Sequence, residues 1–299
     1  MKAPSSSHHS FTLIEMLVAV SIMSFMLLMM AQMTGMAEQA WRMEQNRIDN
    51  FAKARSMVDM FNDDLQRAVF RGDLPIFGTG APAATPTVTS NGLYYFTNTV
   101  FTTAFYTRLP GVPASASTPV RDVSLVSYAI NYNSTNQGVD QIVLQRSDLA
   151  VPWSSSQNLL FQGNIQTVLQ NSPATAREVA PGVVGFRVAF RLSDGTMIDP
   201  TQGTYTGYNS TNPVVAVDIG VAVVGKQSLA LLSPLQIQNL QKAFAAPLSF
   251  TAPAPVTNGI KASWDQKVLT AGFYSGSGYP KDLGGGLKTF ERWVACPAF

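Results

Sequence analysis

Carboxylates in three parts of this chain have residue types and spacings that could do chemistry. Glu15 is the only ionisable residue within the apolar stretch of residues 11–31. A pair of adjacent aspartates follows at residues 63–64, and two more lie in the polar stretch of residues 194–212. The three settings indicate different chemistry: a charge that must be paired in an apolar medium, acid–base work by neighbouring carboxylates, and oxygen ligands for a hard cation.

Glu15 is the most informative of these residues. An ionised side chain within an apolar span costs about 2.5–3.5 kcal/mol at the centre of a membrane, and less near its edge, so this carboxylate needs a partner or a purpose. If several such helices pack together, a positive group of a neighbouring chain could be that partner. The alternative is a plain signal anchor whose Glu15 lies in the headgroup region.

The two aspartate pairs are weaker candidates. Asp63 and Asp64 point about 100° apart on a helix, which is poor geometry for paired-carboxylate catalysis. Solvation, or an ion pair with Arg67, is the favoured interpretation. Asp194 and Asp199 have oxygen ligands of the kind that suit Ca²⁺, but their spacing is irregular and the order of an EF-hand is absent. We therefore expect an ordinary polar loop and no metal, with a calcium loop as the less favoured alternative.

Composition excludes several classes of function. The 299 residues are 46% hydrophobic and 13% charged, with a formal net charge of +2, so the chain can hold one large or two modest domains. The net charge is too small for a nucleic-acid footprint, and we expect no nucleic-acid partner. Cys296 is the only cysteine, which excludes an intramolecular disulfide and a cysteine-based metal site. We expect no cofactor.

A long helix must position Glu15. The apolar stretch has the length that a helix needs to cross a bilayer. Residues 32–71 contain no proline and are rich in good helix formers. Apolar residues recur there at spacings of seven, three and four, which predicts one stripe that packs on a globular domain: Trp41, Ile48, Phe51, Val58, Phe61, Leu65 and Ala68. We interpret Trp41 as the first core residue rather than an interfacial anchor.

The rest of the chain is predicted to be mainly antiparallel β structure, which makes the fold class α+β. Runs rich in β-branched and aromatic residues predict strands at residues 92–97, 100–107, 123–131, 141–146, 183–192 and 214–224. A hairpin is predicted from residues 127–131 and 141–146, with a loop at residues 132–140. A turn is predicted at residues 193–195. Ser233 and Pro234 predict the start of a short surface helix that Pro247 ends.

The end of the chain is predicted to be an appendage. Pro and Ala dominate up to Pro255, which indicates a linker, and an aromatic and Gly-rich segment follows from residue 260. We predict an irregular segment that packs on the domain, with a binding surface as the alternative. The expected division of the chain is a leader at 1–10, a membrane half-helix at 11–31, an extramembrane half-helix at 32–71, a β-rich domain at 72–246 and the appendage at 247–299.

The order of the N-terminal features resembles one known signal. Ser10 stands directly before Phe11-Thr12-Leu13-Ile14-Glu15, and the apolar helix follows. This pattern resembles the class III signal of type IV prepilins and type II secretion pseudopilins. The resemblance implies that a prepilin peptidase cuts between Ser10 and Phe11 and methylates the new amine, which makes Glu15 the fifth mature residue with a role in assembly register. Ser10 departs from the glycine that is usual before the cut.

The resemblance also implies a function and a location. The segment that ends the helix, with Asp64-Leu65-Gln66-Arg67-Ala68, and the order of the strands resemble J-type minor pseudopilins, and the layout looks like prepilin-type proteins of verrucomicrobial cassettes. The implied protein is a structural minor pilin or pseudopilin. It would be anchored in the bacterial inner membrane with a cytoplasmic N-terminus and a periplasmic domain, and would assemble with homologous subunits into a filament.

Two other classes of function stay open in the sequence. One is a membrane-anchored periplasmic binding module whose β domain and aromatic tail hold a ligand without a filament. The other is an enzyme, which is disfavoured because His8 and His9, the only histidines, lie in the implied leader. A mature chain without histidine excludes Ser-His-Asp and Cys-His mechanisms. We therefore predict that the protein is not an enzyme.

Overall fold

The computed structural model describes residues 12–69, 76–79, 87–89, 93–98, 100–113, 120–132, 141–152, 176–199, 214–245, 248, 259–276, 278–280 and 283–295. The chain divides into two compact units, Met1–Asn46 and Arg47–Phe299. Helix α1 (Leu13–Gln66) contributes to both units, and the second unit contains the sheets and the remaining helices.

The α1 helix begins and ends for local reasons. At its start, the Thr12 and Glu15 side chains bond each other's backbone amides, which satisfies two amides that a helix start leaves unpaired. At its end, the Val69 amide donates to the Tyr106 carbonyl at 2.8 Å, so the chain leaves the helix to pair with a strand. The helix therefore ends at Gln66, although good helix formers continue toward residue 71.

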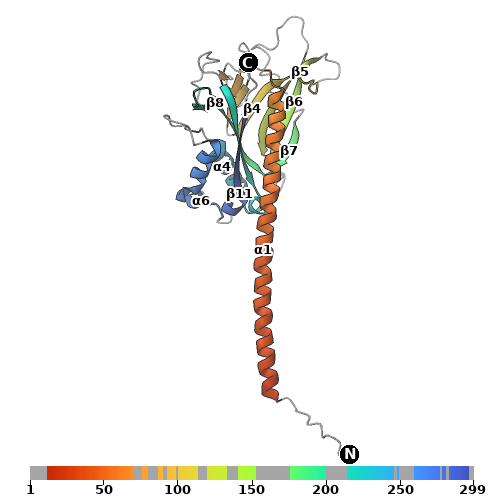
Figure 1. Cartoon of the computed structure of the whole chain (residues 1–299), viewed down its shortest axis with the longest axis vertical. Coiled ribbons are helices and arrows are strands. Elements are labelled where there is room, and N and C mark those ends of the chain that lie inside the picture. The colour runs from red at the N-terminus through yellow and green to blue at the C-terminus, as the bar shows by residue number, and fades with distance from the viewer. Residues whose placement is uncertain are drawn as a thin grey trace, which may run out of the picture. The chain divides into compact units, whose positions relative to one another are not determined.

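The larger sheet has the strand order β2-β1-β3-β4-β5-β6-β7. Four of its strands, β4 to β7, are labelled in Figure 1. Only β1 and β3 are parallel neighbours; the other adjacent pairs are antiparallel. The strands are β1 (Ile76–Thr79), β2 (Thr87–Thr89), β3 (Leu93–Asn98), β4 (Val100–Thr107), β5 (Val120–Tyr132), β6 (Ile142–Pro152) and β7 (Arg177–Pro181). Tyr128 pairs with Arg146 and Ile130 with Leu144, which confirms the predicted hairpin; its loop at residues 133–140 lies outside the described residues.

The smaller sheet has the order β11-β10-β8-β9 and is antiparallel throughout. Its strands are β8 (Val183–Leu192), β9 (Met197–Ile198), β10 (Val214–Val224) and β11 (Leu287–Ala295). Gly182 alone joins β7 of the larger sheet to β8, and its φ of 83° is a conformation that glycine adopts without strain. Gly195, with φ 85°, closes the predicted turn between β8 and β9.

Short helices cover part of the smaller sheet: α3 (Lys226–Ala230), α4 (Pro234–Ala245), α5 (Ile260–Leu269), α6 (Ala271–Gly276) and α7 (Leu283–Gly286). The α4 helix starts as predicted, because Ser233 and Gln236 form a reciprocal cap of 2.8 and 3.3 Å. Its Ile237, Leu240 and Phe244 are at most 1% exposed, so α4 is one wall of the core. A long N-terminal apolar helix followed by antiparallel sheets confirms the α+β class.

The C-terminal segment differs from its prediction. Residues 260–295 form three helices and a strand where described, and β11 pairs with β10 from Leu287 opposite Val224 to Ala295 opposite Ala216. Ile260 and Trp264 are 0% and 1% exposed. The prediction of an irregular segment is therefore wrong here. The physical reason is that β10 is buried, so its backbone needs ladder partners on both sides, and β11 supplies the second one.

Candidate functional site

The start of α1 is the site that the sequence singles out. The Thr12 amide and the Thr12 hydroxyl each donate to Oε2 of Glu15 at 2.9 Å, and the Glu15 amide donates to the Thr12 hydroxyl at 3.3 Å. This is a capping box in which Thr12, the residue directly before the helix, satisfies the carboxylate. Ser10 and Phe11, the expected processing residues, lie outside the described residues.

The helix that follows Glu15 has an apolar surface on all sides. Within the described residues, Leu13–Arg42 is the one helical stretch long and apolar enough to cross a membrane, and an 18-residue window within it has a mean hydropathy of 2.3. Its hydroxyl groups bond the backbone of the same helix at 2.8 Å, from Ser21 to Val18, from Ser24 to Val20 and from Thr34 to Met30. A helix whose polar groups are bonded internally is what the hydrocarbon of a bilayer requires.

Trp41 does not fill the role predicted for it. Its side chain is 74% exposed, and it lies in the first unit, Met1–Asn46. The core face of α1 begins with Asn50 and Ala54 instead. The interpretation of Trp41 as the first core residue is therefore wrong, because a stripe at helical spacing shows which face is apolar but not where a partner surface starts.

The fold and this helix define the class of protein: they fit a membrane-anchored, single-pass protein with a globular α+β unit. Comparison with known proteins narrows the class. Residues 5–31 match the family model of the prokaryotic N-terminal methylation motif. The chain thus carries a type IV pilin-like prepilin signal. No curated protein matches the chain.

The motif has consequences for processing and activity. It supports a type IV pilin-like subunit that is processed, and it implies processing by a prepilin peptidase and assembly with other pilins. Pilin-like proteins with this motif are structural subunits rather than enzymes. The match includes the whole apolar stretch of residues 11–31 and the six residues before it, so it places the site at the beginning of the chain.

The two adjacent aspartates lie in different environments. Asp63 is exposed, whereas Asp64 is 4% exposed and pairs with Arg146 of β6 at 2.7 and 3.0 Å. The Tyr128 hydroxyl also donates to Asp64. The predicted pairing with Arg67 is wrong for Asp64, because this face of α1 packs on the sheet. A second carboxylate, Asp148, bonds Arg146 at 3.0 Å.

This network is a structural lock between helix and sheet. Burial, followed by the charge of Asp64, raises the pKa of the Tyr128 phenol, which stays protonated and donates. Bonds to Asp64 raise the pKa of Arg146 against the opposing effect of burial. Tyr128 and Arg146 therefore both keep the protons that they donate, and the arrangement suits a fixed link rather than proton transfer.

Asp194 and Asp199 also have structural roles. Asp194 accepts the Thr196 amide at 2.8 Å within the turn after β8. Asp199 is buried; its Oδ2 accepts from Arg187 at 2.5 Å and from the Leu248 amide at 2.7 Å. The described residues contain no group of three or more His, Cys, Asp or Glu that could hold a metal ion. The rest of the polar stretch that was the less favoured calcium loop, residues 200–212, lies outside the described part of the chain.

Sequence reasoning missed a second carboxyl pair, at the start of α5. The Ile260 amide donates to Asp218 at 3.2 Å and the Lys261 amide to Glu291 at 2.9 Å, so both carboxyl groups cap this helix. Gly259 precedes the helix, and a side chain there would collide with the Glu291 carboxylate. Burial, followed by the neighbouring Glu291, raises the pKa of Asp218 to about 9. No local sequence pattern could have predicted this pair, because Asp218 lies on β10 and Glu291 on β11.

Proposed function

We propose that this protein is a minor pilin or pseudopilin, a structural subunit that is cut between Ser10 and Phe11, methylated and assembled into a type II secretion or type IV pilus-like filament. The observation that carries the proposal is the methylation motif at residues 5–31, which runs directly into the exposed apolar helix. In this role the leader and the bilayer orient the chain, with residues 1–10 in the cytoplasm and the second unit in the periplasm. Function then follows from packing and not from catalysis.

The proposed role of Glu15 is to set the axial register of the filament. In the unprocessed chain its carboxylate is bonded by Thr12, so the uncut helix start has no need of a partner. Cleavage before Phe11 would place a positive amine four residues from this carboxylate. In a medium of low dielectric constant, the amine of a neighbouring subunit is then the strongest available partner.

A J-type position within the filament is the finer part of this proposal. What supports it is that the end of α1, which carried the resemblance, is bonded to the larger sheet through Asp64 and Arg146 of β6. The proposed division of the chain keeps the leader at residues 1–10 and the membrane half-helix at residues 11–31. The verrucomicrobial assignment rests on layout alone.

The experiment that tests the processing step is co-expression of the full chain with a prepilin peptidase, followed by intact mass and N-terminal sequencing. We expect a mature N-terminus at Phe11 that bears one methyl group. A chain that keeps residues 1–10, or one that is cut after Ala31, contradicts the proposal.

The register role predicts a selective defect in assembly. Glu15→Ala should be cut and methylated like the wild type, but its incorporation into filaments in a pull-down of sheared fibres should fall at least tenfold, the change that 1.4 kcal/mol produces. Glu38→Ala is the matched control, because it removes an exposed carboxylate from the same helix, where Glu38 pairs with Arg42. Normal incorporation of Glu15→Ala contradicts the register role.

A further inference from the structure

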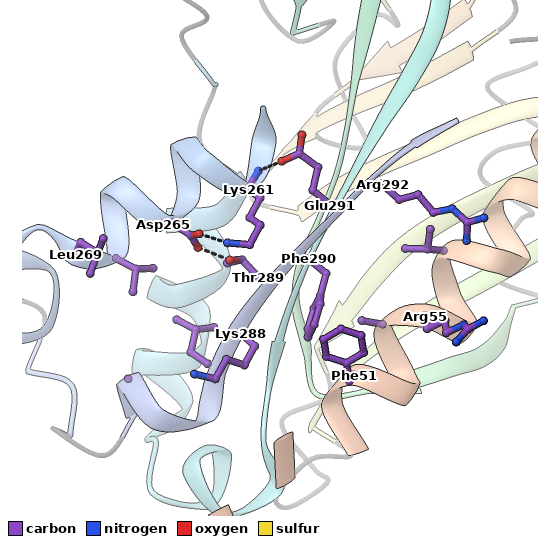
Figure 2. A pocket seen from close by; sticks show the side chains of 15 residues that line it. Phe51, Arg55, Lys261, Asp265, Leu269, Lys288, Thr289, Phe290, Glu291 and Arg292 are labelled. Carbon is purple, nitrogen blue, oxygen red and sulfur yellow. Dashed lines mark hydrogen bonds and ion pairs between the residues drawn. The ribbon is translucent and has the colours of Figure 1, made fainter. Parts of the chain in front are cut away.

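A groove of about 760 Å³ lies in the second unit, between α1, α5 and β11 (Figure 2). The strand β11 runs between the two helices. Phe290 stacks edge-on against Phe51 of α1, with ring centres 5.1 Å apart, whereas Thr289 bonds Asp265 of α5. Arg292 likewise pairs with Asp59 of α1. Successive β11 side chains therefore face opposite helices, as the alternation of a strand requires.

The groove exposes the edge of a sheet. Strand β11 is the last in its sheet, and among the described strands it pairs only with β10. An edge strand leaves every second backbone amide and carbonyl without a ladder partner, and such an edge accepts a further strand readily. One way in which proteins protect an edge is to keep the strand very short, but β11 is nine residues long.

The walls of the groove are mainly apolar, and basic residues outnumber acidic ones among the charged side chains that line it. Phe51 and Leu269 are 59% and 82% exposed, which leaves apolar surface in contact with solvent. The lining contains four basic and two acidic residues, Arg55, Lys261, Lys288, Arg292, Asp265 and Glu291. The carboxylates already have partners, since Lys261 and Thr289 bond Asp265 and the Lys261 amide bonds Glu291.

Two of the basic residues are available to an incoming group. Lys288 makes no ion pair with any described residue. The Arg55 side chain is 79% exposed and only approaches Asp59, at 3.7 Å. The uncommitted charge of the groove is therefore positive, and these two residues come from opposite sides of it (Figure 2).

We propose that this groove binds an extended, acidic segment of a partner protein, which adds a strand to the free edge of β11. Its backbone pairs with β11, and its alternate side chains contact the apolar surfaces of α1 and α5. Its carboxylates pair with Arg55 and Lys288. This goes beyond assembly through the N-terminal helix, because it gives the second unit a partner of its own.

A second copy of this chain is disfavoured in the two registers at the centre of the strand. In antiparallel self-pairing centred on Glu291, the two Glu291 carboxylates would face each other. Centred on Phe290, each Lys288 would face the partner copy's Arg292 position. Like charges directly opposite each other on neighbouring strands are destabilising, whereas an acidic segment meets no such repulsion from Arg55 and Lys288.

The test uses the full chain in detergent micelles and a short fluorescein-labelled peptide in which pairs of valines alternate with pairs of glutamates, so that each face of the added strand carries both residue types. Fluorescence anisotropy is the measurement, and a peptide in which pairs of valines alternate with pairs of lysines is the matched probe. We expect the acidic peptide to bind and the basic one not to bind. The variant Arg55→Glu with Lys288→Glu should weaken binding at least tenfold, equivalent to about 1.4 kcal/mol. The control Lys242→Glu changes an exposed lysine outside the groove and should bind like the wild type.

Hydrogen exchange then separates strand addition from simple charge attraction. Bound peptide should slow exchange of β11 amides and leave those of β6 unchanged. Equal binding by the Arg55/Lys288 variant, or binding without protection of β11, overturns the proposal. A dimer in sedimentation that this variant abolishes also overturns it, since the occupant would then be a second copy. None of these outcomes depends on cleavage at Ser10 or on filament formation.

Discussion

The two parts of α1 show how one helix can be built for two environments. Before Asn46, large apolar residues such as Leu17, Phe25 and Met30 are 62–68% exposed on all sides. Beyond Arg47, Met57, Phe61 and Leu65 are at most 1% exposed and share one face. An all-round apolar surface requires an apolar solvent, whereas a stripe requires a packed partner. Apolar content alone does not separate the two cases; periodicity does.

The polar side chains differ in the same way. In the first part, Ser21, Ser24 and Thr34 bond carbonyls of their own helix. In the second part, Asp64 bonds Arg146 and Asn50 donates to the Gly286 carbonyl at 3.3 Å, both far along the chain. The first part thus meets its hydrogen-bonding needs locally. The second part depends on the rest of the fold.

The largest expected effect comes from the core face of the helix. Phe61 is fully buried and contacts the rings of Phe105, Tyr128 and Phe186 at 5.1–5.6 Å. Phe61→Ala should lower the free energy of unfolding of the second unit by about 3–5 kcal/mol, because it removes a buried ring and leaves a cavity. Chemical denaturation followed by tryptophan fluorescence measures this.

Phe25→Ala is the matched change in the first part of the helix. Phe25 is 62% exposed, so the second unit should unfold at the same denaturant concentration as in the wild type. An equal loss of stability in both variants would contradict the distinction between the two environments.

A smaller effect is expected from the lock between α1 and the sheet. Asp64→Asn keeps the shape of the side chain but removes the charge that bonds Arg146, and should cost about 2 kcal/mol, within the range for hydrogen bonds to charged groups. Asp63→Asn, one residue earlier and exposed, should stay within about 0.5 kcal/mol of the wild type. Equal unfolding midpoints for the two variants would show that the lock contributes nothing.

The smallest effect extends the comparison to carboxyl groups at helix starts. Glu15 caps its own helix, whereas Asp218 caps α5 from a neighbouring strand while buried beside Glu291. The pKa of Asp218 rises from 3.8 to about 9, so the folded chain holds a proton that the unfolded chain releases. This contribution to stability is complete below pH 3.8 and is lost as pH rises toward about 9.

Asp218→Asn should remove this pH dependence, because an amide can accept the Ile260 amide and donate to Glu291 without ionising. We expect the melting temperature of the variant to exceed that of the wild type by about 2–4 °C near pH 8, a shift typical of 1 kcal/mol, with a smaller difference near pH 5. Asp122→Asn, at an exposed position on β5, is the control. If the two melting temperatures differed by the same amount at all pH values, the proton that Asp218 is expected to hold in the folded chain would be contradicted.

Several features could be predicted because their signals are local. The apolar stretch with Glu15, the strands at residues 100–107, 183–192 and 214–224, and the Ser233 cap depend on periodicity and on residues three or four positions apart. The motif at residues 5–31 is likewise contiguous. Each of these features depends on the local geometry of a helix or a strand, so neighbouring residues predict the feature without knowledge of the fold.

Only the tertiary structure decided which distant residues meet. Arg146 takes Asp64 away from Arg67 because α1 packs on the sheet, and β11 pairs with β10 across residues that give a weak strand signal. The carboxyl pair of Asp218 and Glu291, and the groove beside β11, exist only once these strands are neighbours. Pairings of this kind depend on loop closure and burial over long separations, which local residue patterns do not encode.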